Sequence, residues 1–168
     1  MTLPYIDIYV LTSNRERRTL EKFLDEYTDR ESIEDMHDSE INMLPKDRSY
    51  LEVNSEDYIW IKAETLTNCI DIGLSNPSNC FTLYLRSKHR EINLVILSFT
   101  QDGKLIVGLS IFEYIDAEQT IDNYKFAKEL KDEMYRNYNG SLAYFGLEAS
   151  PAHTEEEFKK QTLTFINN

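Results

Sequence analysis

The sequence predicts an α+β fold, with a single mixed, largely antiparallel sheet covered by three main helices. Helical patterns separate the strand patterns early and late in the chain, whereas three strand patterns follow one another in the middle without a helix. No repeat, glycine-rich linker or change of composition divides the 168 residues. The expected order is therefore β-α-β-α-β-β-β-α-β plus a short C-terminal helix, in one domain over residues 1–168.

The first strand is predicted over residues 5–12, where β-branched and aromatic residues alternate between two faces. Ser13 and Glu16 have the spacing of a capping box, so the first helix is expected to begin near Asn14. Its apolar side chains recur at helical spacing and predict one stripe facing the sheet. This stripe consists of Leu20, Phe23, Leu24 and Tyr27.

The next part of the chain is strongly acidic. Residues 25–57 carry twelve acidic side chains against three basic ones, a net charge of -9 out of the chain's -12. We expect a loop-like segment over about 28–57, held against the core by a few apolar residues. The segment YIWIK at 58–62 predicts a short strand, with a longer helix as the alternative because Ile59 has apolar partners at helical spacing. The apolar residues of the loop-like segment are Ile41, Met43, Leu44 and Pro45.

A second helix is predicted around residues 66–75, and Pro77 ends it because the residue before a proline is pushed out of the helical region. Further along, Gln101-Asp102-Gly103-Lys104 predicts a hairpin turn in which Gly103 supplies a positive φ. The strands around this turn have almost no polar interruption, so we expect them to be central in the sheet. The strand patterns of this middle region lie at 80–86, 92–100 and 105–113.

The C-terminal part predicts a helix, a strand and a second helix. The first helix is expected over about 118–138, because Asn139-Gly140 provides the left-handed conformation that ends a helix. A last strand follows over 141–148. Thr154 and Glu157 then form a second capping box, which begins the short terminal helix.

The excess of acidic residues excludes some partners. Nucleic acids and anionic membranes carry negative charge that a binding protein must neutralise with Lys and Arg, so we expect neither, and a basic partner instead. The first residues lack the features of a secretory signal, and no apolar run approaches the ~18 residues of a membrane span, so a cytoplasmic location is expected. In a reducing compartment Cys69 and Cys80 are expected to be buried free thiols.

The sequence contains no compact catalytic or metal-binding motif. His37, His89 and His153 have no second histidine or cysteine nearby at metal-ligand spacing. Asp35, His37 and Asp38 could hold a divalent ion, but the interpretation we favour is a solvated acidic loop, since the central glycine of a calcium loop is missing. No nucleophile motif or phosphate-binding glycine loop is present either. We therefore expect no cofactor.

Two features depart from an ordinary amphipathic pattern. Asp7 interrupts an apolar strand, and we interpret it as pointing to a wetter sheet face with Tyr5 and Tyr9, with a catalytic role as the alternative. Three arginines crowd the start of the first helix, where the helix dipole disfavours cations by about 0.3–1 kcal/mol each. We expect them to pair with the acidic stretch, and an anion site is the alternative. These arginines are Arg15, Arg17 and Arg18.

Three segments, DIYVLTSNR (7–15), TLTNCIDIGL (65–74) and LSFTQDGKLIVGLSI (97–111), resemble the pattern of small uncharacterised bacterial proteins, some of which are immunity proteins of polymorphic toxin systems. The resemblance covers the first strand and helix and the central hairpin. It contains no catalytic motif and does not extend to the acidic stretch at 25–57. It implies a protein that neutralises a cognate toxin by occluding its active face.

Two classes of function remain open. The lack of a catalytic signature favours a non-enzymatic protein that binds a basic partner, such as a toxin domain. The alternative is a small-molecule-binding domain or an enzyme with a pocket at the sheet edge. For the first class, we expect carboxylates of the acidic stretch to provide charge and tyrosines at its borders to provide apolar anchors. The predicted partner-binding residues are Glu31, Glu34, Asp35, Asp38 and Glu40, with Tyr27, Tyr50 and Tyr58 as the anchors.

Overall fold

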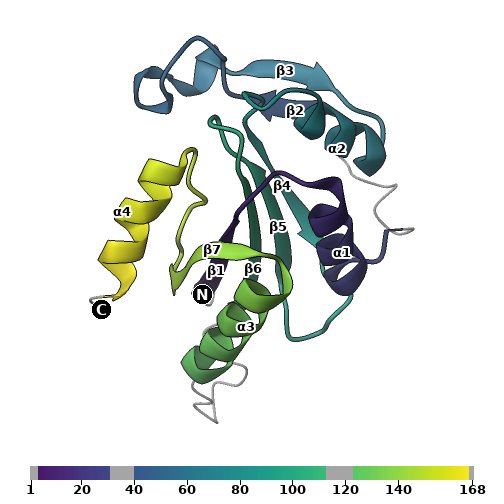
Figure 1. Ribbon diagram of the computed structural model, residues 1–168. Coiled ribbons are helices and arrows are strands. Elements are labelled where there is room, and N and C mark those ends of the chain that lie inside the picture. Colours follow the sequence, from purple (N-terminus) through teal and green to yellow (C-terminus); the bar gives the residue numbers. More distant parts are fainter. Residues whose placement is uncertain (1–3, 31–39, 113–122, 167–168) are drawn as a thin grey trace.

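The computed structural model describes residues 4–30, 40–112 and 123–166 (Figure 1). It confirms the α+β class, with a five-stranded antiparallel sheet in the order β4-β5-β6-β1-β7. The two long apolar strands around the predicted turn are neighbours inside this sheet, as expected. The elements are β1 (Tyr5–Thr12), α1 (Arg17–Tyr27), β2 (Glu40–Met43), β3 (Ile59–Lys62), α2 (Leu66–Ser75), β4 (Phe81–Arg86), β5 (Leu94–Phe99), β6 (Leu105–Phe112), α3 (Asn123–Asn137), β7 (Gly140–Leu147) and α4 (Glu155–Ile166), with two short 3-10 helices, η2 (Tyr50–Glu52) and η3 (Ser55–Asp57).

The prediction of a single mixed sheet was wrong. The strand at 58–62 is confirmed as β3, but it pairs with β2 in a separate two-stranded antiparallel sheet. The loop-like segment thus contains a strand, because Ile41 and Met43 alternate with the exposed Asn42 and are buried against the core. Four residues are too few to show this period clearly within an acidic sequence.

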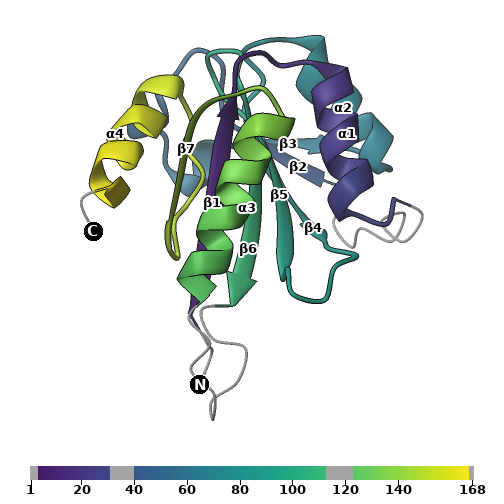
Figure 2. The ribbon, with the colours of Figure 1, turned by 60° about the horizontal axis from the view of Figure 1, so that its bottom comes forward.

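The larger core lies on one face of the five-stranded sheet. Helices α1, α2 and α3 pack on this face, together with the inner side of the two-stranded sheet (Figures 1 and 2). The predicted stripe of α1 is entirely buried, as are Ala127, Leu130 and Met134 of α3. Burial of this many apolar side chains, at roughly 25 cal/mol per Å² of apolar area, is the main stabilising contribution to the fold.

The opposite face of the sheet is also covered, although we expected it to be wetter at β1. Residues 149–152 and helix α4 lie over Tyr9, Leu11 and Tyr144, and α4 contributes the buried Phe158. The Tyr9 hydroxyl donates a hydrogen bond of 2.7 Å to the Ala149 carbonyl, which ties this covering segment to β1. The expected wetter face of β1 is therefore a second, smaller core.

Most of the predicted turns and helix ends are confirmed. Gly103 has a φ of 83° in the turn between β5 and β6, and Asn139 has a φ of 53° after α3. The capping box predicted for α1 does not form, because the Ser13 hydroxyl donates to the Asn139 carbonyl and the helix begins at Arg17. The part of the third helix expected at 118–122 lies outside the described residues.

The second predicted capping box forms in part. Thr154 Oγ1 accepts a hydrogen bond of 3.1 Å from the Glu157 amide, as expected, while the Glu157 carboxylate accepts from the His153 amide instead of that of Thr154. Cys69 and Cys80 are free and buried, as predicted. In the described parts of the chain, no helix is long and apolar enough to cross a membrane.

Candidate functional site

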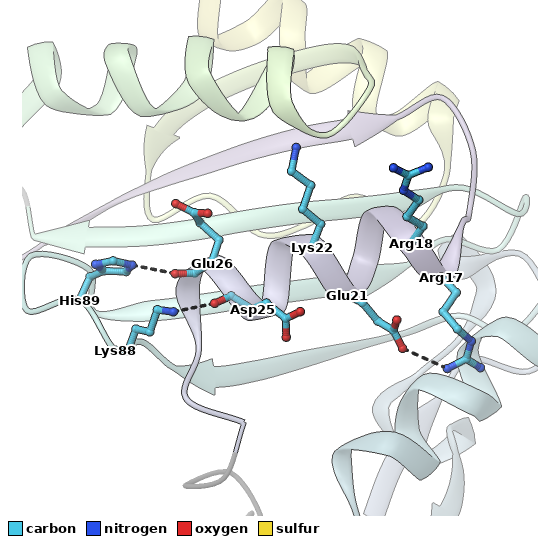
Figure 3. A pocket seen from close by; sticks show the side chains of 8 residues that line it. All are labelled: Arg17, Arg18, Glu21, Lys22, Asp25, Glu26, Lys88 and His89. Carbon is cyan, nitrogen blue, oxygen red and sulfur yellow. Dashed lines mark hydrogen bonds and ion pairs between the residues drawn. The ribbon is translucent and has the colours of Figure 1, made fainter.

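Two surfaces of the molecule qualify as candidate sites: a groove along α1 and the two-stranded sheet with its connection. The groove has a volume of about 800 Å³ and runs beside α1 to the connection between β4 and β5 (Figure 3). None of the described side chains that line it is a serine, threonine or cysteine, so this part of the lining offers no nucleophile of these types. The lining residues are Arg17, Arg18, Glu21, Lys22, Asp25, Glu26, Lys88 and His89.

Several polar groups of the groove are used to hold α1 in place. Lys88 Nζ donates a hydrogen bond of 2.6 Å to the Asp25 carbonyl, and His89 Nε2 lies 2.8 Å from the Glu26 carbonyl, which can only accept (Figure 3). Both carbonyls belong to the last turn of α1, where helix carbonyls lack internal partners. The contacts of the β4–β5 connection thus cap a helix, which is a structural role.

Within the described residues, the three arginines at the start of α1 make no ion pair with the acidic stretch, contrary to our expectation. The guanidinium of Arg15 donates hydrogen bonds to five carbonyl oxygens, and Arg17 pairs with Asp71 of α2 at 2.6 Å and with Glu21 at 3.6 Å. Arg18 is exposed. Arg15 therefore joins three parts of the chain that sequence proximity does not connect. Its acceptors belong to Gly73, Asn76, Asn79, Thr100 and Lys104.

Asp7 is buried, which corrects the expectation that it points to solvent. Its residue is 8% exposed, and burial raises the pKa of its carboxyl group above the ordinary value of 3.8. Hydrogen bonds from the Ser110 side chain and the Ala149 backbone oppose this increase, while the charge of Glu148 adds to it. Because these hydrogen bonds connect Asp7 to β6 and to the covering segment 149–152, the carboxyl group holds that segment over the sheet.

The second surface, which we call the hairpin lobe, comprises residues 40–62. It contains β2, β3 and the two 3-10 helices between them, and it forms a projection at one end of the main sheet (Figure 1). Its inner side packs on the core through Ile41, Met43 and Ile61. On its outer side Trp60 is 63% exposed, opposite the exposed Asn42 in the strand register.

The hairpin lobe exposes three large apolar side chains. Besides Trp60, Ile59 is 46% exposed and Leu51 is 78% exposed. Exposed Glu52 and Glu56 lie near them in sequence. Large apolar groups interspersed with charge are typical of protein interfaces, whereas isolated exposed apolar residues need no explanation.

The predicted partner-binding residues are only partly brought together. Tyr50 and Tyr58 are half-buried in the hairpin lobe, and the Tyr50 ring stacks on His153 with ring centroids 5.1 Å apart. Glu40 is the first residue of β2 and pairs with Lys62 in the strand register. Tyr27 is buried in the core against Phe23 and Tyr138, and is therefore not on a surface. Glu31, Glu34, Asp35 and Asp38 lie outside the described residues.

Sequence reasoning missed the most exposed members of the hairpin lobe. Trp60 alternates with Ile59 and Ile61 along β3, so the period of two places it on the opposite side from the core. This signal was available, but it required knowing that β3 belongs to a small sheet with one covered face. In β1, β5 or β6 of the main sheet the same position would have been covered on both sides.

The described residues contain no group of three or more His, Cys, Asp or Glu side chains that could hold a metal ion. The candidate ion site at Asp35, His37 and Asp38 lies outside them. No protein-family model, curated protein or solved structure matches the chain.

Proposed function

We propose that this chain is a non-enzymatic protein-binding protein whose recognition surface is the hairpin lobe. The observation that carries this proposal is the exposure of Trp60, the single tryptophan of the chain, on the outer side of β3. Tryptophan is among the residues that contribute most to binding energy at interfaces. Burial of its side chain by a partner would remove a large apolar surface from water.

The charge around the hairpin lobe supports a basic partner. The preceding residues 31–39 contain four carboxylates and no Lys or Arg, and the wider stretch 25–57 has a net charge of -9. Acidic groups near an interface accelerate association with a basic protein and make its rate sensitive to salt. The affinity itself would come from exposed apolar side chains that the partner buries on binding, here Trp60, Ile59 and Leu51.

Within this class we propose an immunity protein that neutralises a bacterial toxin domain. The resemblance in the segments 7–15, 65–74 and 97–111 is to small uncharacterised bacterial proteins, some of which are immunity proteins. A toxin that acts on nucleic acid needs a basic surface to bind its substrate, and an acidic protein seated on that surface would exclude the substrate. The groove along α1 supports this function less well, since its polar groups hold α1 itself.

The test uses a basic toxin domain encoded beside this chain as the partner. In one variant Glu31, Glu34, Asp35, Asp38 and Glu40 are changed together to Gln or Asn, and association is measured by stopped flow at 50 and 300 mM salt. We expect the association rate at low salt to fall about 10-fold and its salt dependence to flatten. A control variant carries the same number of amide substitutions on other surfaces, at Glu91, Glu129, Asp132, Glu133 and Glu148.

Two results would count against the proposal. If both variants associate like the wild type, or if the control variant loses as much rate as the first, the acidic stretch does not direct binding. A neighbouring operon of metabolic genes, with no basic toxin domain, would point instead to the small-molecule class.

A further inference from the structure

We propose that the basic partner supplies an extended segment that adds as a strand to the free edge of β3; this inference rests on the proposed function and specifies its binding mode. Among the described strands, β3 has a neighbour on one side only, β2. Figure 1 shows β3 at the outer rim of the molecule, beyond β2. The backbone N–H and C=O groups on the other side of β3 are therefore a template for an incoming strand.

The composition of β3 favours this mode. Its sequence IWIK contains β-branched and aromatic residues, which suit a strand, and no proline or glycine. Natural edge strands are protected from pairing by short length, charges, prolines, bulges or a covering element. Of these, β3 has a length of four residues and one charged side chain, Lys62, and it contains no proline. Ile59 and Trp60 lie on opposite sides of the strand and are both exposed, so each side offers apolar contact to an added strand.

The other sheet edges suit a basic strand less well. Strand β7 has α3 and α4 packed against it. Strand β4 is joined at its start to the hairpin lobe, where the Leu44 amide donates to the Cys80 carbonyl at 2.9 Å, and at its other end Arg86 and Lys88 would repel a basic segment. Strand β3 instead has acidic residues before it and after it. These residues are Glu56, Asp57 and Glu64.

Charge also selects between a foreign segment and a second copy of the chain. Each copy has a net charge of -12, of which -9 lies at residues 25–57. Pairing of β3 with β3 of another copy would bring two such stretches together, and like charges at an interface disfavour it. An extended segment with Lys or Arg alternating with apolar residues has the opposite charge and the same period of two.

The experiment uses three blocked heptapeptides as probes, followed by titration and by amide hydrogen exchange read by NMR. KVKFKVK is the basic strand, KPKFKPK keeps its charge and its phenylalanine but cannot form a ladder, and EVEFEVE reverses the charge. We expect KVKFKVK to bind at least 10-fold more tightly than either control peptide. We also expect its saturation to slow exchange at least 10-fold at the amides of residues 59–62 that face away from β2.

A matched pair of protein variants locates the binding site. Trp60→Lys on β3 should weaken KVKFKVK binding at least 10-fold, whereas Tyr84→Lys, at an aromatic residue 55% exposed on β4, should not change it. Equal binding of KPKFKPK, unchanged exchange in β3 on saturation, or no binding of KVKFKVK would overturn strand addition. The toxin-association experiment does not depend on the peptides. If the toxin associates at a salt-dependent rate but the peptide does not slow amide exchange in β3, the proposed function stands and this binding mode is refuted.

Discussion

The main sheet and the hairpin lobe bury their strands in opposite ways. In β1, β5 and β6 nearly every residue is buried, because helices and the segment 149–152 cover both sheet faces. In β3 three of the four residues are exposed, including Ile59 and Trp60. Both sheets are built from similar β-forming residues, so the difference lies in what covers them.

Under the proposed function, this difference separates the residues that stabilise the fold from those that bind a partner. Side chains buried in the main sheet contribute to the free energy of unfolding, and their truncation leaves cavities. An isolated two-stranded hairpin is marginally stable, so the hairpin lobe depends on its inner residues, which pack on the core. Its outer residues contribute little to stability and are free to contact a partner. Substitutions of buried residues should therefore lower the free energy of unfolding. Substitutions of the exposed hairpin-lobe residues should lower affinity for a partner and leave stability nearly unchanged.

The largest loss of stability is expected from Phe23→Ala. Phe23 is fully buried and contacts the rings of Tyr27 and Tyr138. Removing it should lower the free energy of unfolding by about 3–5 kcal/mol, measured by urea denaturation. A loss below about 1 kcal/mol would show that α1 is not an integral part of the larger core.

A smaller loss is expected from Arg15→Ala. The change removes the donor shared by carbonyls of α2, of the β5–β6 turn and of the segment between α2 and β4, and should cost about 1.5–3 kcal/mol. Arg15→Lys should recover only part of the lost stability, because an ammonium group lacks the planar, forked set of donors of the guanidinium. The control Arg18→Ala, at an exposed position, should stay within about 0.5 kcal/mol of the wild type in the same assay. Equal effects of Arg15→Ala and Arg18→Ala would contradict the assigned role.

Gly103→Val tests the turn between the two central strands. Its φ of 83° is unfavourable for a β-branched residue, and an added Cβ would lie 3.3 Å from Pro77 Cβ. We expect a loss of about 1–2 kcal/mol in thermal or urea unfolding. Gly103→Asn should lose less, since asparagine tolerates the left-handed region. An unchanged melting temperature for the valine variant would argue against the turn conformation.

Asp7 predicts a pH dependence of stability. Burial raises the pKa of Asp7 in the folded state above its unfolded value, so the folded protein retains a proton that the unfolded chain has already released. The contribution of Asp7 to stability is therefore greatest below the unfolded pKa and declines as pH rises through the folded one. In urea titrations from pH 3.5 to 7.5, Asp7→Asn should gain stability relative to the wild type as pH increases. A difference that stays constant with pH would contradict the raised pKa.

Local patterns predicted much of the main sheet. The stripe of α1, the turn at Gly103 and the end of α3 at Asn139 each depend on residues close in sequence, and the structure confirms them. Strand β2 was missed because its period of two spans only four residues within an acidic segment. Neither strand alone predicts that β2 and β3 pair with each other and that β3 does not join the main sheet.

Features that depend on distant segments were not predictable in the same way. The burial of Asp7 requires residues 149–152 to return over the sheet, and the acceptors of Arg15 come from α2 to the β5–β6 turn. The exposure of Trp60 likewise follows from which sheet β3 joins. In each case composition and spacing indicate an unusual residue, but only the fold determines its surroundings.

The most direct test compares Trp60→Lys with Tyr84→Lys for stability and for affinity toward the proposed partner, a basic toxin domain. Both replace an exposed aromatic side chain on a strand with a lysine, one in the hairpin lobe and one on β4. We expect each variant to unfold within about 0.5 kcal/mol of the wild type. Trp60→Lys should raise the Kd at least 10-fold, about 1.4 kcal/mol, with Tyr84→Lys unchanged. If Trp60→Lys binds like the wild type, or if Tyr84→Lys loses as much affinity, the hairpin lobe is not the recognition surface.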